Sequence, residues 1–449
     1  MKLGKKLVAV LGATAMLGSV AACGSQSGSA NSSDSSGKTT LTVWAWDSTM
    51  GRTIKGFEKA NPNIKIKLVN AGTSKDQYTA LNNAMQAGSG APDLAQIEYY
   101  ALPEYVIRGY VENVADLGAK DFSDFYTPGT WASVNINDGV YGLPMDSGPM
   151  AWFYNKEVFD KAGVDPTQIT SWDQFYEAAK KVRATGSYIT SDSGDAGFFD
   201  SMTWQNGAVP FETSKDGKTV SIKLTSNPKV KEFEDWWQKL IDEDLIDTKT
   251  AGWTDDWNKG LDNGSIASLL IGAWMPYNLL TGAPNGDGKW RITQMPTSDG
   301  QPAGSESGGS SLTVIKSDDK AKVEAAYKYL EYVTHNKDGV AVRVEGGAFP
   351  ADNNSLSSED FLNQTAITDA DGKAHEYFGG QKFNEELAKA AKNVRAGYKF
   401  LPFEVYARGK FGDFVGKSFT GDQKLSDGVK DWQADLVSYA QQQGYTVKE

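Results

Sequence analysis

Aromatic and acidic side chains gather where three predicted strands end. They are Trp44, Trp46, Asp47, Glu98, Tyr99, Tyr100 and Asp146. A flat ring can cover the C–H face of a sugar, while carboxylates bind the hydroxyl groups at its edge. Open α/β sheets bind their ligands at the carboxyl ends of their strands. The pattern therefore predicts a carbohydrate-binding surface.

Stacking of this kind supplies useful affinity. Covering about 60–100 Å² of a sugar face at about 25 cal/mol/Å² contributes roughly 1.5–2.5 kcal/mol per ring. Each aromatic residue could also belong to a hydrophobic core. Side chains alternate along a strand, so Trp44 and Trp46 share one face, and one of them could be core while the other contacts ligand.

Motifs for catalysis or cofactor binding are missing from the sequence. It holds two histidines and one cysteine, too few for a zinc cluster of these residues, and no convincing Ser-His or Cys-His arrangement. The stretch "APNGDGKW" lacks the first glycine of a phosphate loop, because Ala283 stands there. Among 57 acidic residues nothing singles out a pair for glycoside hydrolysis. We therefore expect a protein that is not an enzyme, with no cofactor and no metal.

The N-terminal residues predict export. Three lysines precede an uncharged run from Leu7 to Ala22 that is too short and too polar to span a membrane, which is typical of a secretory signal. "VAAC" resembles a bacterial lipobox, so residues 1–22 are expected to be a lipoprotein signal peptide and Cys23 the lipid-modified residue. Residues 23–40 contain no large apolar residue and are expected to form a disordered, lipid-anchored tether. The folded part would then lie outside the cytoplasm, anchored to the outer face of the cell membrane.

The remainder of the chain alternates strand-like and helix-like segments. A helix is expected from Met50 to Ala60, a strand over "IKIKLV", and a helix from Ser74 to Ala87. Ser171 and Gln174 form a predicted capping box, and Asn227 caps a helix whose Trp236 and Trp237 are expected in the core. This order predicts an α/β fold of mostly parallel sheets flanked by helices. The formal charge of −12, without a basic cluster, argues against a nucleic-acid partner.

Several stretches occur in an order that identifies a family. They are "LTVWAW", "FEKANPNIKIKL", "APDLAQIEYYALPEY", "DGVYGLPMDSGPMAWFYNKEVFDKAGV", "SWDQFYEAAKKV", "DNGSIASLLIGAW", "ITQMPTSDG", "GGSSLTVIKS" and "GGAFPA". With the lipobox, they resemble an extracellular solute-binding lipoprotein of carbohydrate ABC transporters, similar to the maltodextrin-binding group. The likeness spans nearly the whole chain.

The resemblance implies a periplasmic-binding-protein type II-like fold of two lobes joined by a three-crossing hinge. Lobe 1 would comprise residues 41–146 plus 305–349, and lobe 2 residues 147–304 plus 350–449. The crossings are expected near 146–148, 296–305 and 349–353, where glycine and short polar residues could absorb rotation of the backbone.

The family's ligand contacts can be carried over residue by residue. They fall on Trp46, Asp47, Glu98, Tyr99, Tyr100, Asp146, Trp204, Gln205, Trp274, Glu306 and Gly308, and Trp253 is a further candidate from its own sequence context. Trp274 is the favoured stacking platform, and Trp204 is placed in a loop-like stretch. Trp253 fits a ligand or a structural role equally well, whereas Trp257 is expected in the core.

The implied function is capture of an oligosaccharide by closure of the lobes and delivery to membrane permease subunits of an ABC importer. A monomer is expected, and a separate ATPase would supply the energy, because the chain has no Walker sequence. The alternatives are a secreted glycoside hydrolase, a lectin, or a binding protein for a non-sugar solute such as a peptide or a polyol phosphate. Residues around the cleft depart from the maltodextrin pattern, so the sugar does not transfer.

Overall fold

The computed structural model describes residues 38–369 and 371–449. The predicted signal peptide, Cys23 and all but the last three residues of the predicted tether lie outside these residues. Strand β1 (Thr39–Trp44) includes Thr39 and Thr40, which pair with Ile64 and Lys65, so these two residues belong to the sheet and not to the predicted tether. Among the helices of the described part, none has the length and apolar composition needed to cross a bilayer.

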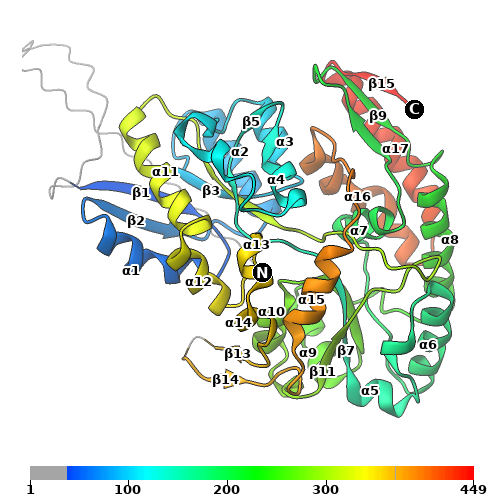
Figure 1. Ribbon diagram of the computed structural model, residues 1–449. Helices are drawn as coiled ribbons and strands as arrows, with labels where there is room; N and C mark the ends of the chain where they lie inside the picture. The colour runs from blue at the N-terminus through cyan, green and yellow to red at the C-terminus, as the bar shows by residue number, and fades with distance from the viewer. Residues whose placement is uncertain (1–37, 370) are drawn as a thin grey trace, which may run out of the picture.

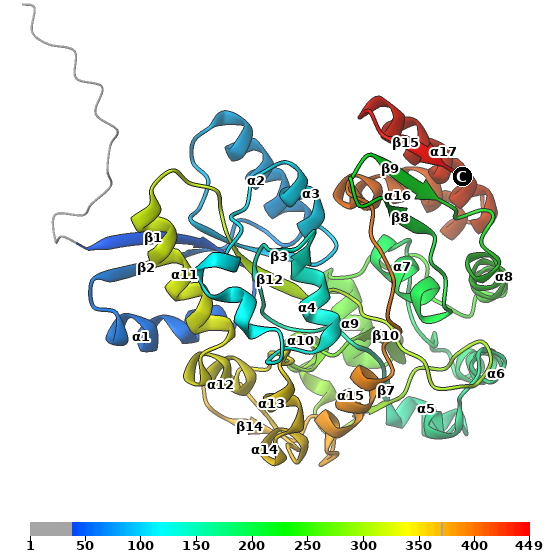
Figure 2. The ribbon, with the colours of Figure 1, turned by 45° about the horizontal axis from the view of Figure 1, so that its top comes forward.

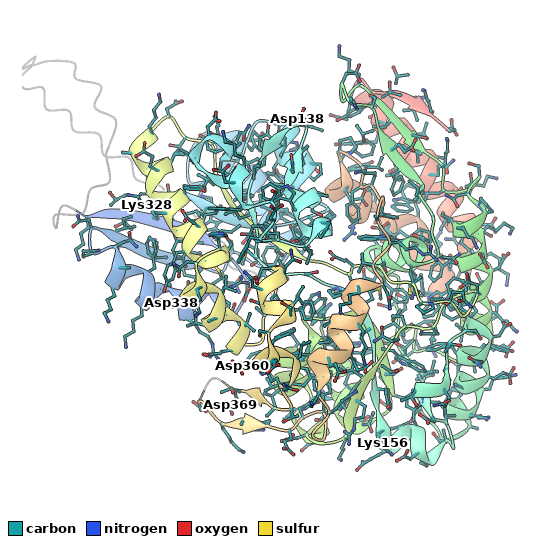
Figure 3. All side chains as sticks on the ribbon, viewed as in Figure 1. Asp138, Lys156, Lys328, Asp338, Asp360 and Asp369 are labelled. Carbon is teal, nitrogen blue, oxygen red and sulfur yellow. The ribbon has the colours of Figure 1, made fainter. Side chains whose placement is uncertain are left out.

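Two lobes, each built around its own sheet, form the molecule (Figures 1 and 2), and side chains fill the space around both sheets (Figure 3). Lobe 1 contains the five-stranded sheet in the order β2-β1-β3-β12-β6 and the helices packed on it. Its strands are β1, β2 (Ile64–Val69), β3 (Leu94–Glu98), β6 (Leu143–Pro144) and β12 (Ser310–Val314), with the short pair β4 (Asn135–Ile136) and β5 (Gly139–Val140) beside them. Its helices are α1 (Met50–Ala60), α2 (Lys75–Ala87), α3 (Leu102–Ile107), α4 (Pro128–Val134), α11 (Lys320–Thr334) and α12 (Lys337–Glu345).

Lobe 2 is built on the sheet β10-β7-β11, with two smaller sheets beside it. Its strands are β7 (Met150–Asn155), β8 (Phe211–Thr213), β9 (Thr219–Ile222), β10 (Ser268–Gly272), β11 (Trp290–Thr293), β13 (Ile367–Thr368), β14 (Ala374–His375) and β15 (Thr446–Lys448). Its helices are α5 (Lys156–Lys161), α6 (Trp172–Ala184), α7 (Ala196–Gln205), α8 (Pro228–Asp242), α9 (Asp255–Asn263), α10 (Met275–Gly282), α13 (Asn353–Ser357), α14 (Glu359–Leu362), α15 (Phe383–Lys392), α16 (Glu404–Phe419) and α17 (Leu425–Gln442).

The α/β class is confirmed, but the pairing differs between the lobes. In lobe 1, β1 pairs in parallel with β2 and β3, as predicted, and β12 is antiparallel to its neighbours. In lobe 2, β7 pairs antiparallel with both β10 and β11. The expectation of a mostly parallel sheet is therefore wrong for lobe 2. A run of apolar residues shows that a strand is buried on both faces, which is typical of parallel sheets, but β7 is covered on both faces in an antiparallel sheet.

Strand β7 shows how lobe 2 is held together. Met150, Trp152 and Tyr154 face one hydrophobic core, formed with helices α6, α7, α8, α16 and α17. Ala151 and Phe153 face a second core on the other side of the sheet, formed with α9, α10 and α15. Because successive side chains point to opposite faces, the whole segment must be apolar. Strand β7 therefore joins the two hydrophobic cores of lobe 2, and it begins directly after the first segment that comes from lobe 1.

Local capping signals in the sequence are confirmed. Ser171 and Gln174 make both reciprocal hydrogen bonds of a capping box at the start of α6. Asn227 caps α8 with Pro228 in its first turn, and Trp236 and Trp237 are buried. These signals act within one helical turn, so they can be interpreted without knowledge of the tertiary structure.

The chain passes between the lobes three times. Residues 145–149 link β6 to β7, residues 294–309 link β11 to β12, and residues 346–352 link α12 to α13. The first link is tied to the other two, since Ser147 N donates to Phe349 O and Met150 N donates to Ser305 O. The first two predicted crossing positions lie within these links, and the third extends one residue beyond its link, to Asn353 at the start of α13. Side chains on the links therefore lie at the junction of the lobes.

Candidate functional site

The first group of predicted site residues lies at the end of β1. Val43 and Ala45 are fully buried, whereas Trp44 and Trp46 on the opposite face are half-buried and pack against the α2–α3 side of lobe 1. Trp46 meets the edge of Tyr78 with ring centroids 6.2 Å apart. The alternation predicted for this strand is confirmed, and it directs both indoles to one side of the sheet.

Asp47 is held by a buried ion pair. Its Oδ2 lies 2.6 Å from Arg343 Nη2, and its Oδ1 accepts hydrogen bonds from the amide and hydroxyl of Thr49. Burial alone would raise the pKa of Asp47, but the Arg343 charge and the Thr49 hydrogen bonds lower it below its usual range. Both carboxylate oxygens are thus already engaged within lobe 1.

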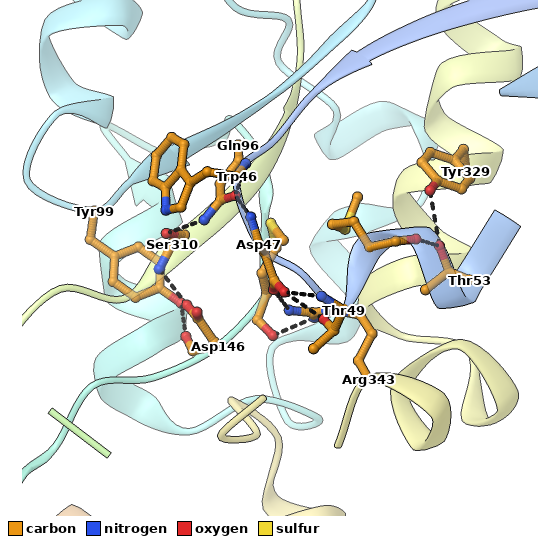
Figure 4. A network of polar contacts seen from close by, with 12 residues as sticks. Trp46, Asp47, Thr49, Thr53, Gln96, Tyr99, Asp146, Ser310, Tyr329 and Arg343 are labelled. Atoms are coloured by element: carbon orange, nitrogen blue, oxygen red, sulfur yellow. Dashed lines mark hydrogen bonds and ion pairs between the residues drawn. The ribbon is translucent and has the colours of Figure 1, made fainter. Parts of the chain in front are cut away.

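A hydrogen-bond network connects β1, β3 and the first link (Figure 4). Gln96 Oε1 accepts from the amides of Trp46 and Asp47, and Gln96 Nε2 donates to Ser310 Oγ. Ser310 N in turn donates to Asp146 Oδ1 at 2.6 Å. Five polar groups on three strands and the link are thereby fixed relative to one another.

Tyr99 and Glu306 extend this network toward lobe 2. Tyr99 Oη donates to Asp146 O at 2.6 Å, and Glu306 Oε1 accepts from Ser147 Oγ at 2.8 Å. Ser201 Oγ, on α7 of lobe 2, donates to Glu306 O. Asp146 and Glu306 therefore lie on two of the links between the lobes.

Asp146 and Glu306 hold their protons unusually tightly. Burial raises the pKa of Asp146 to about 7, and the nearby Asp47 charge adds to the shift while Arg343 opposes it. Burial likewise raises the pKa of Glu306 to about 7, against the hydrogen bond from Ser147. Near neutral pH each group can donate or accept a hydrogen bond to a polyhydroxylated ligand.

Trp274 lies against the second link. It directly precedes α10, it is half-buried, and its Nε1 donates to Ser307 O at 2.7 Å. Gly308, at φ +76°, leaves space for this indole, because a Cβ there would lie 3.2 Å from Trp274 Nε1. The structure therefore places Trp274 against Ser307 and Gly308, next to Glu306 on the second link, and a ligand contact at these residues stays a prediction.

Gly309 permits the close approach of Tyr99. Its φ is +90°, and a Cβ at this position would lie 2.7 Å from the Tyr99 ring. Gly309→Ala should therefore displace Tyr99, break its hydrogen bond to Asp146 O and lower the free energy of unfolding by more than the about 1–2 kcal/mol that a left-handed alanine costs on its own. Chemical denaturation would measure this loss. Gly88→Ala, also left-handed but with open space around its Cβ, is the control for backbone strain alone.

Glu98 and Tyr100 face lobe 2 through an arginine that the sequence analysis missed. Arg408 on α16 lies over the Tyr100 ring, 3.8 Å from its centroid, and pairs with Asp200 at 2.8 Å and Glu404 at 3.6 Å. Burial raises the pKa of Glu98, and the Arg408 charge opposes that shift. Since Tyr100 belongs to lobe 1 and Arg408 to lobe 2, this contact joins the lobes.

Trp204 lies in a helix, which corrects the loop prediction. It is in the last turn of α7, it stacks on Tyr398 with centroids 5.0 Å apart, and its Nε1 donates to Arg395 O. Asp195 starts this helix by accepting from the amides of Gly197 and Phe198. Trp204 therefore packs beside the Arg408 cluster on a rigid element.

The remaining predicted residues differ sharply in exposure. Gln205 is buried, its Nε2 donates to Ala303 O, and its Oε1 has no hydrogen-bond partner among the described residues. Trp253 is 56% exposed, and Trp257 is buried, as predicted. The site residues thus form three adjoining groups: the Asp47 network, the Arg408 cluster and the Trp274 side of the second link.

The sequence carries no local signal for the two arginines that the sequence analysis missed. Arg343 and Arg408 lie in "AVRVEGG" and "VYARGKF", where single arginines in helical segments look solvent-exposed. Each is instead buried against acids more than 200 residues away in the sequence. The sequence analysis found only acidic and aromatic residues near the cleft motifs, so both arginines are corrections to it.

Comparisons with known proteins identify a family to which this chain belongs. A family model described as bacterial extracellular solute-binding protein matches residues 52–369. The arabinooligosaccharide-binding protein of Bacillus subtilis (strain 168) is 28% identical over 320 residues, covering 69% of this chain and 72% of that protein. The lactose-binding protein of Rhizobium radiobacter is 27% identical over 308 residues, covering 65% of this chain and 70% of that protein.

A solved structure is more similar. It is the ABC transporter associated binding protein from B. animalis subsp. lactis Bl-04 in complex with β-1,6-galactobiose, which is 56% identical and superposes with a TM-score of 0.87. The match covers 92% of this chain and 100% of that one. The galacto-N-biose/lacto-N-biose I-binding protein from Bifidobacterium longum, at 24% identity and a TM-score of 0.77, shares the fold.

Proposed function

The chain belongs to the bacterial extracellular solute-binding protein family, and we propose that it captures a short galactose-containing oligosaccharide for an ABC importer. The observation that carries this proposal is the 56% identity, over 92% of the chain, to a protein solved with β-1,6-galactobiose. The site geometry is compatible with such a ligand, because indole and phenol rings lie beside carboxyl groups at the junction of the lobes. Rings cover the apolar face of a sugar, and carboxyl groups bind its hydroxyls.

Capture would work by closure of the lobes on the ligand. A ligand shifts the equilibrium toward a closed state only if it binds that state more tightly than the open one. The candidate contacts meet this condition: Trp46, Glu98 and Tyr100 come from lobe 1, whereas Trp204 and Trp274 come from lobe 2. The permease subunits would recognise the closed shape, and the chain itself would perform no catalysis.

The placement of the protein in the cell is part of the proposal. Lipid modification at Cys23, after removal of residues 1–22, would anchor the protein on the outer face of the membrane, with a tether extending to β1. For the lobe boundaries we propose 41–146 plus 305–349 and 147–304 plus 350–449, with Thr39 and Thr40 added to lobe 1 as the start of β1. The protein would act as a monomer.

Calorimetry tests the proposed function. The full mature chain is titrated with β-1,6-galactobiose, lactose, an arabinooligosaccharide and maltose, with an amino acid and sn-glycerol 3-phosphate as non-sugar controls. We expect micromolar or tighter binding of the galactose-containing sugar and none of the controls. Binding of only a control, or of no sugar, would contradict the proposal.

Product analysis separates binding from hydrolysis. Asp146 and Glu306, both with a pKa of about 7, are groups that a glycoside hydrolase could use. We expect galactobiose to be recovered intact after prolonged incubation with the protein. The release of galactose would favour the hydrolase alternative.

Trp274 is the position where stacking is tested. Trp274→Ala should weaken galactobiose binding by roughly ten- to seventyfold, which corresponds to the 1.5–2.5 kcal/mol expected for one ring. The melting temperature of the free protein should change little, because this side chain is only half-buried. Trp257→Ala is the matched control, since that indole is buried in the same core and its loss should unfold the protein more easily. A large loss of stability in Trp274→Ala with unchanged affinity would make Trp274 a core residue.

A further inference from the structure

Trp253 has an exposed side chain and an unfavourable backbone conformation. Its side chain is 56% exposed, the most of any large apolar residue that the structure describes as exposed. Its φ is +67°, in the left-handed region that bulky residues rarely adopt. A glycine could make the same turn without strain. The presence of tryptophan here therefore calls for an explanation beyond the turn.

The start of helix α9 explains only part of this arrangement. Trp253 precedes Thr254, whose Oγ1 accepts from Trp257 N and donates to Ala251 O. The indoles of Trp253 and Trp257 lie 5.1 Å apart, so the contact helps to fix the entry of the chain into the helix. A smaller apolar residue would serve that purpose. The outer face of the Trp253 ring is left in solvent.

The exposed indole is continuous with the candidate site. Its ring centroid lies 5.6 Å from that of Trp274, with the two planes tilted by 33°. Trp274 Nε1 donates to Ser307 O, next to Glu306 on the second link. Exposure increases along this path, from the half-buried Glu306 and Trp274 to the exposed Trp253. This path of neighbouring residues runs from the second link to a solvent-exposed ring.

The chemistry along the path suits a saccharide chain. Trp253 offers a flat apolar face, and the hydroxyl of Thr254 and the carboxylate of Asp255 are exposed beside it. A pyranose ring has the matching apolar face and a rim of hydroxyl groups, and its binding would remove the indole from water. A ligand of two units could occupy the Trp274 region, and a third unit would extend toward Trp253.

We propose that Trp253 is an additional stacking platform that binds the third sugar unit of ligands longer than a disaccharide. This inference depends on the proposed function, because it assumes that the inner units lie beside Trp274. It makes Trp253 a determinant of ligand length. The backbone strain is then explained by the position that the ring must take.

Comparison of ligands of different length tests this role. Wild-type protein, Trp253→Ala and Trp253→Phe are titrated by calorimetry with β-1,6-linked galactobiose, galactotriose and galactotetraose. We expect Trp253→Ala to bind the tri- and tetrasaccharide at least fivefold more weakly than wild type and the disaccharide within twofold. Trp253→Phe should keep most of the affinity for the tri- and tetrasaccharide that Trp253→Ala loses. Ile107→Ala removes a similarly exposed apolar side chain, 51% exposed on α3, and should change no affinity.

Trp253→Gly separates a loss of affinity from a loss of stability in Trp253→Ala. If Trp253→Ala melts below wild type, Trp253→Gly provides the same comparison, since glycine adopts a φ of +67° without strain and should melt higher than the alanine variant. Equal weakening for all three sugars, no weakening for any, or exclusion of the trisaccharide by wild type would each overturn the inference while the proposed function stands. Failure of wild type to bind any of the sugars would overturn both.

Discussion

Replacing Arg343 with methionine should lower the free energy of unfolding by roughly 3–5 kcal/mol, as expected when one partner of a buried ion pair is removed. The Arg343 side chain is 3% exposed, and its Nη2 lies 2.6 Å from Asp47 Oδ2. Its Nη1 also donates to Met145 O, and its Nε to Thr49 Oγ1. Methionine fills part of the volume but leaves Asp47 charged and buried without its cation. Denaturation by urea at pH 7 would measure the loss.

Two controls isolate the cause. Lys231→Met removes an ion pair to Asp235 in which both side chains are more than 60% exposed, and it should cost less than about 1 kcal/mol. The double variant Asp47→Asn with Arg343→Met removes the unpaired charge and should recover part of the stability. If Arg343→Met costs no more stability than Lys231→Met, the buried ion pair between Asp47 and Arg343 does not stabilise lobe 1.

Sequence analysis was sufficient where the relevant interactions are local. The capping box of α6 and the cap of α8 depend on neighbouring residues and lie where they were predicted, whereas β1 overlaps the predicted strand but begins two residues earlier, at Thr39. The grouping of Asp146 with Glu306 and Trp274 was less direct. It followed from family resemblance and from the rule that strand ends carry ligand residues.

Long-range pairing could not be derived in the same way. Arg408 meets Asp200 and Tyr100 only after three crossings have brought α16, α7 and β3 together. Trp204 looked like a loop residue because polar residues surround it, but burial of Phe199 and Met202 makes the segment helical. The antiparallel direction of β7 likewise depends on where its partners enter the sheet. In each case the local sequence allows two outcomes, such as exposed or buried, loop or helix, and parallel or antiparallel, and contacts from distant parts of the chain select one of them.

The raised pKa values at the junction predict how stability changes with pH. A carboxyl group with a higher pKa in the folded protein than in the unfolded chain binds more protons when folded. Stability is then greatest below the unfolded pKa and is lost as the pH rises through the folded one. For Glu306 this window extends from its ordinary value of 4.5 to about 7, and for Asp146 from 3.8 to about 7. Each unit of pKa difference corresponds to about 1.4 kcal/mol.

The ligand-free protein should therefore become less stable as the pH rises from 5 to 8. Glu306→Gln keeps the shape and the hydrogen bond from Ser147 but cannot ionise, so this variant should lose less stability over that range than wild type. Part of the slope should remain, because burial also raises the pKa of Asp146 and Glu234 to about 7 and of Asp192 to about 6. Asp116→Asn, at a carboxyl that is 99% exposed, is the control and should leave the slope unchanged. Urea titrations at four pH values would decide the question, since equal slopes for wild type and Glu306→Gln would show that Glu306 releases its proton at its ordinary pKa.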